Sequence, residues 1–122
     1  MQIEKLELYR SIAEMAYVIA KADKGLSSEE RIAFYDVIQK ELDYDAWAAQ
    51  SRFELLDEVT DPSLDKTYND AINDFKKYKK HVTPDVKAKT IRVLQKVADA
   101  CNGFNEKEAF IIDRVKRDLD AL

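Results

Sequence analysis

The sequence has few of the residues that most often carry chemistry or mark turns. It holds one cysteine, one histidine, two glycines and two prolines among 122 residues. One cysteine rules out an internal disulfide framework, and one histidine rules out most transition-metal sites built within a single chain. All-β architectures need many more turn residues than these glycines and prolines supply. The scarcity therefore favours a helix-rich protein in which carboxylates are the remaining candidates for metal ligands.

Length, composition and charge predict one domain over residues 1–122. A chain of this size matches a single domain, and 46% apolar with 36% charged residues is typical of a compact fold with a real core. The net charge of −4 gives no field that attracts phosphate backbones, so we expect no nucleic-acid partner. The sequence shows no bilayer-length apolar run, no signal-peptide pattern and no cysteine pair. Together these features predict a cytoplasmic location.

Apolar residues recur every three or four positions, which predicts an all-α bundle of about six or seven helices. The first helix is expected over residues 3–22, with a single apolar stripe. The later helices are expected to begin at these capping residues: Ser27 with Glu30, Asp43 or Asp45, Asp61 before Pro62, Thr83 before Pro84, and Asn105 with Glu108. The helix that starts at Asp61 should continue to Val82, and Asn102-Gly103 should end the next one.

Several residues could belong either to the core or to a functional surface. Helical spacing favours the core or its edge for four aromatic residues: Tyr35, Tyr44, Trp47 and Phe53. We expect His81 to be solvated at the end of a lysine-rich helix, and Cys101 to be an inert core residue. The run Lys76-Lys77-Tyr78-Lys79-Lys80 is either a solvated helix end or a surface for an anionic partner, such as lipid headgroups or an acidic protein.

The two ends of the chain carry related helix–turn–helix segments. Shifting the chain by 78 residues superimposes five identical residues: Ala20 on Ala98, Ala22 on Ala100, Gly25 on Gly103, Glu30 on Glu108, and Val37 on Val115. In each copy the alanines precede a turn, the glycine lies in the turn, and the glutamate follows the helix cap by three residues. The repeat predicts two similar hairpins packed with pseudo-symmetry, connected by the segment from Asp43 to Val82.

These residues resemble the tellurite-resistance TerB family, whose helical fold is built around two hairpins with turns of the form Ala-Asp-Gly. The first copy, residues 20–30, is similar to this signature with one residue inserted between Asp23 and Gly25. The second copy, residues 98–108, departs further, because Cys101 stands where the family has its aspartate. The resemblance covers the organisation of most of the chain, but its specific letters lie in these two short stretches.

The resemblance implies a role in tellurite and chemical-stress resistance, through protein partners assembled at the inner face of a membrane. It also implies a divalent cation, Ca²⁺ or Mg²⁺, held by acidic residues that correspond here to Asp23, Glu30 and Glu108. Glu29 lies beside this set, and Cys101 argues against a second equivalent site. The resulting hypothesis is a TerB-like binding domain with no enzymatic activity of its own.

The same acids also have a purely structural interpretation. The capping pairs within residues 27–30 and 105–108 satisfy free N–H groups at two helix starts without any metal. An EF-hand is excluded, because counting from either glycine places alanine, and then lysine or asparagine, at the ligand positions. Two alternative functions stay open: a structural or oligomerisation module with Trp47 or Phe53 at its interface, and a metal-assisted hydrolase.

Overall fold

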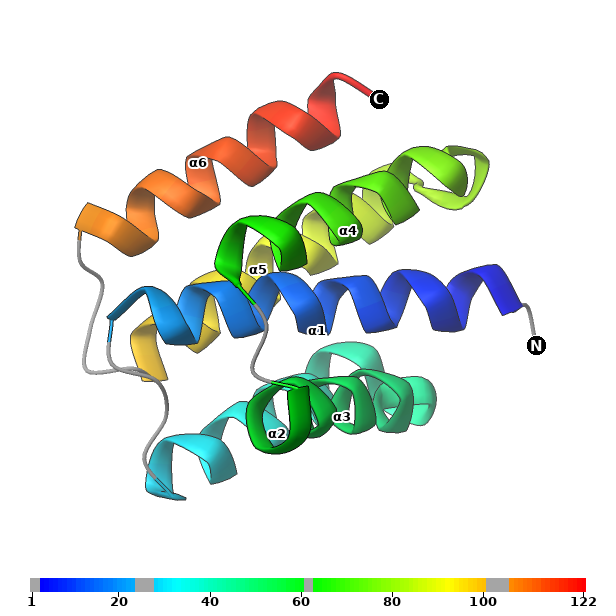
Figure 1. The fold of residues 1–122 in the computed structure, drawn as a ribbon. Helices are drawn as coiled ribbons and strands as arrows, with labels where there is room; N and C mark the ends of the chain where they lie inside the picture. The colour runs from blue at the N-terminus through cyan, green and yellow to red at the C-terminus, as the bar shows by residue number, and fades with distance from the viewer. Residues whose placement is uncertain (1–2, 24–27, 61–62, 101–105) are drawn as a thin grey trace.

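The computed structural model describes residues 3–23, 28–60, 63–100 and 106–122, and these fold into helices (Figure 1). The elements follow in this order: α1 (Ile3–Asp23), α2 (Ser28–Leu42), η1 (Asp43–Asp45), α3 (Ala46–Leu55), η2 (Leu56–Thr60), α4 (Leu64–Lys77), η3 (Lys79–His81), α5 (Pro84–Ala100) and α6 (Glu106–Asp120). η1 and η3 are short 3₁₀-helices, and η2 is a π-helical continuation of α3. No strand occurs in these described ranges, so the predicted all-α class is confirmed.

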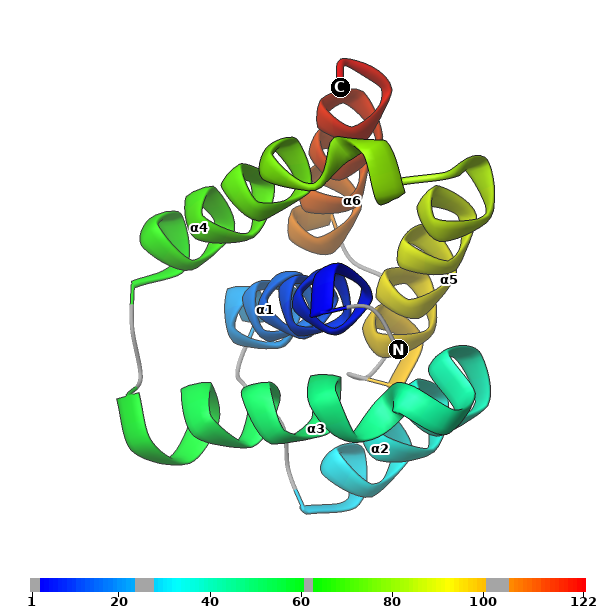
Figure 2. The same cartoon turned by 90° about the vertical axis from the view of Figure 1, so that its right-hand side faces the viewer.

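α1 runs through the middle of the bundle, and α3, α4, α5 and α6 pack around it (Figure 2). Every residue from Ser11 to Ala20 is buried. The expectation of a single apolar stripe on this helix is therefore wrong. A helix that is apolar on all sides is buried on all sides, and the only charged residue in this stretch is Glu14. Three alanines in the same stretch have side chains small enough for neighbouring helices to pack closely.

Phe53 of α3 lies in an aromatic cluster that joins α1, α2 and α3. Its ring centroid is 4.0 Å from that of Phe34 and 6.2 Å from that of Tyr17. Tyr35 meets Phe53 edge-on, with the ring centroids 6.5 Å apart. Phe53 and Phe34 are fully buried, while Tyr35 packs against the core from its edge. These positions confirm the expectation for Phe53 and Tyr35.

The expectation for the other two aromatic residues is wrong. Trp47 is 50% exposed and Tyr44 is 89% exposed. The side of α3 that faces the core carries Ala46, Ala49 and Phe53, which are spaced by three and four residues. Trp47 follows Ala46 directly and is therefore turned about 100° away from this face. The core therefore accommodates the small alanines of this helix and leaves the large Trp47 side chain half-exposed.

The helix starts are partly as expected. Thr83 Oγ1 accepts a hydrogen bond from the backbone N–H of Val86 at 3.2 Å, which confirms the predicted cap and Pro84 as the first residue of α5. α4 begins at Leu64 with Ser63 as its cap, so the predicted start at Asp61 is wrong. It ends at Lys77 and not at Val82, because the chain tightens into η3.

Asp45 precedes α3 at the cap position, but its side chain makes no capping hydrogen bond. Its Oδ2 lies 3.2 Å from Lys5 Nζ and so joins η1 to the first turn of α1.

The two turns that carry the repeat lie outside the described residues. The predictions that fall there are the Ser27 and Asn105 caps, the glycine turns at 25 and 103, and the environment of Cys101. The pseudo-symmetry of the two hairpins therefore stays a prediction. Among the helices that the structure describes, none is long and apolar enough to cross a membrane.

Candidate functional site

The three predicted acidic residues belong to one end of the bundle. α1 ends at Asp23, α2 begins at Ser28, and α6 begins at Glu106. The end of α1 and the beginnings of α2 and α6 lie on the same side of the molecule (Figure 1). The backbones of Asp23, Glu30 and Glu108 are therefore at a common end, while the side chains of Asp23 and Glu30, and that of Glu29, lie outside the described part of the structure.

Glu108 is the predicted site residue whose side chain the structure describes. It lies in the first turn of α6 and is 0% exposed. A carboxylate in the first turn of a helix interacts favourably with the helix dipole, so this position suits either a structural cap or a ligand-binding role. Glutamate is almost never fully buried without a compensating interaction, and Glu108 has such contacts in its surroundings.

Of the three predicted metal ligands, the structure describes the side chain of Glu108. Within residues 3–23, 28–60, 63–100 and 106–122, no group of three or more His, Cys, Asp or Glu side chains could hold a metal ion. Ca²⁺ takes six to eight oxygen ligands and Mg²⁺ six. Glu108 supplies an oxygen donor of the right chemistry, and the other protein ligands would have to come from Asp23 and Glu30.

An apolar groove lies at the same end. Its volume is ≈ 520 Å³, which is within the range of about 300 to 1,000 Å³ that is typical of ligand pockets. It is lined by Ala22 of α1, Leu64 of α4 and four residues of α6: Glu106, Lys107, Phe110 and Ile111. Phe110 is 65% exposed. The groove therefore brings together the last turn of α1, the start of α4 and the first two turns of α6, with an aromatic side chain at its surface.

A model of the tellurite resistance protein TerB family matches residues 10–120 of the 122-residue chain. The chain belongs to the TerB family. A search of curated proteins and a search of solved structures each found no significant match. The TerB match includes both copies of the repeat, residues 20–30 and 98–108, so the resemblance inferred from those short stretches extends over almost the whole domain.

The TerB domain also contains a buried polar seam that sequence reasoning missed. Glu14, in the middle of α1, is 6% exposed. Its Oε2 accepts a hydrogen bond from Arg52 Nη1 of α3 at 3.1 Å, and its Oε1 has no hydrogen-bond partner among the described residues. On the α4 side, Ser11 Oγ lies 3.2 Å from Asp74 Oδ2. The seam therefore runs along α1 between α3 and α4.

The pKa of Glu14 is raised to about 7, mainly because the carboxyl group is buried; Arg52 acts to lower the pKa, and the carboxylates of Asp74 and Asp70 act to raise it. A single glutamate inside an otherwise apolar helix was the sequence signal for this site. It was not recognised, because a helix with one apolar stripe would have placed Glu14 in solvent.

Proposed function

We propose that this TerB-family chain is a cytoplasmic binding domain without enzymatic activity of its own, which acts in stress response through protein partners and a divalent cation. Its framework would be two related hairpins in a bundle of about six or seven helices. Partners would bind at the end where α1 ends and α6 begins. The observation that carries the proposal is the apolar groove with Phe110 at its surface. A solvent-exposed aromatic side chain beside an apolar groove is typical of protein interaction sites.

The cation in this proposal is Ca²⁺ or Mg²⁺, and its protein ligands are Asp23, Glu30 and Glu108. Two observations support it: these three positions belong to one end of the bundle, and the Glu108 carboxylate is fully buried there. Hard cations prefer carboxylate oxygens as ligands. The cation would also lower the repulsion between acids from three helices.

Amide chemical shifts followed during titration with Ca²⁺, Mg²⁺, Mn²⁺ and Zn²⁺ test the cation. We expect saturable changes around residues 23–30 and 106–108, and their loss in Asp23→Asn/Glu30→Gln. The control is Asp113→Asn, which removes an exposed charge in the middle of α6. If the amide chemical shifts of these two stretches do not change at millimolar metal, the cation is not part of the function.

The partner site is tested by capture from the native cell, with two matched variants. Phe110→Ser removes the exposed aromatic residue of the groove, and Ile32→Ser removes a side chain of similar exposure from α2. A specific partner should bind the natural chain and Ile32→Ser, and should be lost with Phe110→Ser. Equal retention by both variants would place the partner site elsewhere.

The half-exposed Trp47 favours one alternative, a structural module that oligomerises. Phe53, the other residue expected at such an interface, is buried in the core and cannot serve. Light scattering over a range of concentrations separates the two readings. A concentration-independent monomer argues against the oligomer, whereas a dimer that Trp47→Ser dissociates would favour it.

A further inference from the structure

The opposite end of the bundle carries a cluster of lysines that form no ion pair with the residues that the structure describes. Lys76 and Lys77 lie in the last turn of α4, and Lys79 and Lys80 in η3. All four side chains are exposed, and none of them forms an ion pair with any described residue. We call these four residues the lysine end. Most other lysines and arginines that the structure describes do pair, for example Lys66 with Asp70 at 2.7 Å.

The stability of α4 does not account for this arrangement. Cations in the last helical turn gain from the helix dipole, and Lys76 and Lys77 occupy that turn. Lys79 and Lys80 follow after the helix has ended, and like charges three and four residues apart repel each other. In a chain with a net charge of −4, four neighbouring lysines without ion pairs are a local feature that costs stability, and Asp118 is the acidic residue that lines a groove with Lys76 and Lys79.

Apolar side chains are exposed on the same end. α1 begins here, and Ile3 in its first turn is 72% exposed. The ion pair between Lys5 and Asp45 holds η1 beside this turn, and η1 carries the 89% exposed Tyr44. The Arg10 guanidinium lies 5.9 Å from the ring centroid of Trp47, so the half-exposed indole lies near the second turn of α1.

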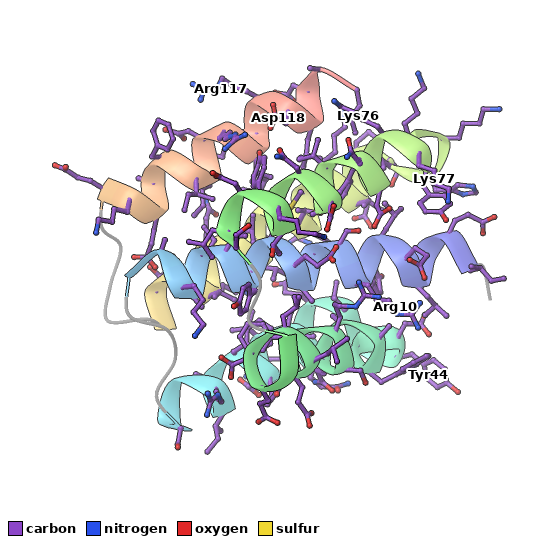
Figure 3. All side chains as sticks on the ribbon, viewed as in Figure 1. Arg10, Tyr44, Lys76, Lys77, Arg117 and Asp118 are labelled. Atoms are coloured by element: carbon purple, nitrogen blue, oxygen red, sulfur yellow. The ribbon has the colours of Figure 1, made fainter. Side chains whose placement is uncertain are left out.

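The lysines and these apolar residues face the same side. His81 of η3 and Lys5 of α1 line one groove, which places η3 beside the first turns of α1. Figure 2 looks onto this end: the start of α1 lies in the middle, with η1 on one side and the end of α4 and η3 on the other. In Figure 3, Lys77 and Tyr44 project from this end, above and below α1.

We propose that this end of the molecule binds the surface of an anionic phospholipid bilayer. The four lysines contact lipid phosphates, while Ile3, Tyr44 and Trp47 reach the boundary between headgroups and acyl chains. Lysine is a flexible, hydrated point charge suited to a diffuse array of anions, whereas recognition of a defined phosphate favours the arginine fork. Aromatic residues with one polar edge are most favourable at the membrane interface. This surface is separate from the groove around Phe110 and does not depend on the cation.

An acidic protein and a nucleic acid are the other anionic partners that four lysines could meet. Charge alone does not distinguish the three, but exposed Ile3 and Tyr44 do. Neither a nucleic-acid backbone nor an acidic peptide provides an apolar environment in which both of these side chains can be buried. A bilayer interface can bury them while its anionic headgroups contact the lysines.

The test uses Trp47 as a built-in reporter, since it is the only tryptophan of the chain. The full chain is mixed with vesicles of phosphatidylcholine alone, or of phosphatidylcholine with phosphatidylglycerol. We expect binding, a blue shift of Trp47 emission and quenching by brominated lipids only with phosphatidylglycerol. Binding should weaken as salt shortens the screening length from about 10 Å at 0.1 M to about 3 Å at 1 M.

Two variants of equal net charge locate the surface. Lys77→Gln/Lys80→Gln removes two charges from the lysine end, and Lys66→Gln/Lys107→Gln removes two exposed charges from the first turns of α4 and α6. At about 1 kcal/mol for each lysine near an anionic membrane, the first variant should lower the partition coefficient about 30-fold. The second should stay close to the natural chain.

Three results would overturn the proposal. They are no binding to phosphatidylglycerol vesicles, equal losses in the two variants, or binding to polyglutamate or duplex DNA in preference to vesicles. If the chain binds vesicles but the emission of Trp47 does not shift, the apolar side chains are not part of the membrane-binding surface.

Discussion

Replacing Glu14 by glutamine should change how the stability of the fold depends on pH. Glu14 lies inside the buried α1, with one oxygen on Arg52 and the other without a hydrogen-bond partner among the described residues. Ionisation places a negative charge at this poorly solvated oxygen, close to the carboxylates on α4. Glutamine keeps the shape of the side chain and stays neutral, so Glu14→Gln removes the titration and little of the packing.

The size of the effect follows from the pKa. Folding raises the pKa of Glu14 from an ordinary 4.5 to about 7. Because the folded state binds the proton more tightly, the stabilisation is fully present below pH 4.5 and is lost as the pH rises through 7. The slope approaches about 1.4 kcal/mol per pH unit, and the total loss between about pH 5 and pH 8 is on the order of 2 to 3 kcal/mol.

Urea unfolding at a series of pH values, followed by helical circular dichroism, measures this loss. Both proteins should carry His81→Gln, so that neither of them contains a histidine. The free energy of unfolding should fall with rising pH in the Glu14 protein and stay nearly level with Glu14→Gln. Glu54→Gln, an exposed substitution on α3, is the matched control and should retain the slope. Parallel curves for Glu14 and Glu14→Gln would refute this account of the seam.

Three further substitutions test the packing and the charged contacts. Phe53→Ala should cost about 3 to 5 kcal/mol of unfolding free energy in urea denaturation, because the ring is fully buried, whereas Phe110→Ala at an exposed position should cost little. Tyr68→Phe should cost about 1 to 2 kcal/mol, since it removes a 2.5 Å hydrogen bond to a carboxylate on α6; an unchanged melting curve would show that the bond contributes nothing. A hydrogen bond from Lys96 lowers the pKa of Glu41. The pair should therefore stabilise the fold above the ordinary glutamate pKa, and this stabilisation should be lost as the pH falls. A double-mutant cycle of Lys96 and Glu41 should give a coupling energy of about 0.5 to 1 kcal/mol, which added salt should reduce.

The parts of the fold that were predictable are those determined by local chemistry. The Thr83 cap and the proline that follows it are a local signal, since a hydroxyl and a missing N–H act within one turn. The buried faces of α5 and α6 follow the helical spacing of their apolar residues, as Val93, Val97 and Val115 show. These features need no information about the neighbouring helices.

The parts that were missed depend on which helices surround which. α1 was expected to have a solvent-facing side, but four helices cover it, so Glu14 is buried where a polar face was assumed. On α3, two helical faces were possible, and packing selected the one with alanines over the one with Trp47. The predicted acidic ligands were neither found nor missed. The family signature in the sequence indicates Asp23 and Glu30, and their side chains lie outside the described part of the structure, so these two ligands stay a prediction.

The two proposed surfaces lie at opposite ends of one continuous helix, and this separation determines how they can interact. α1 has 21 residues and therefore spans about 30 Å between the groove near Ala22 and the exposed Ile3. At physiological ionic strength exposed charges are screened over about 8 Å, so a cation at one end has little direct electrostatic effect on the lysine end. A domain bound to a bilayer through its lysines would leave the groove around Phe110 facing away from the membrane. Partner binding and membrane binding should therefore occur together without competing. If cation binding does alter vesicle binding, the effect has to be transmitted by a change in how α1 packs. Glu14 is the ionisable residue that is buried in α1 between the two surfaces.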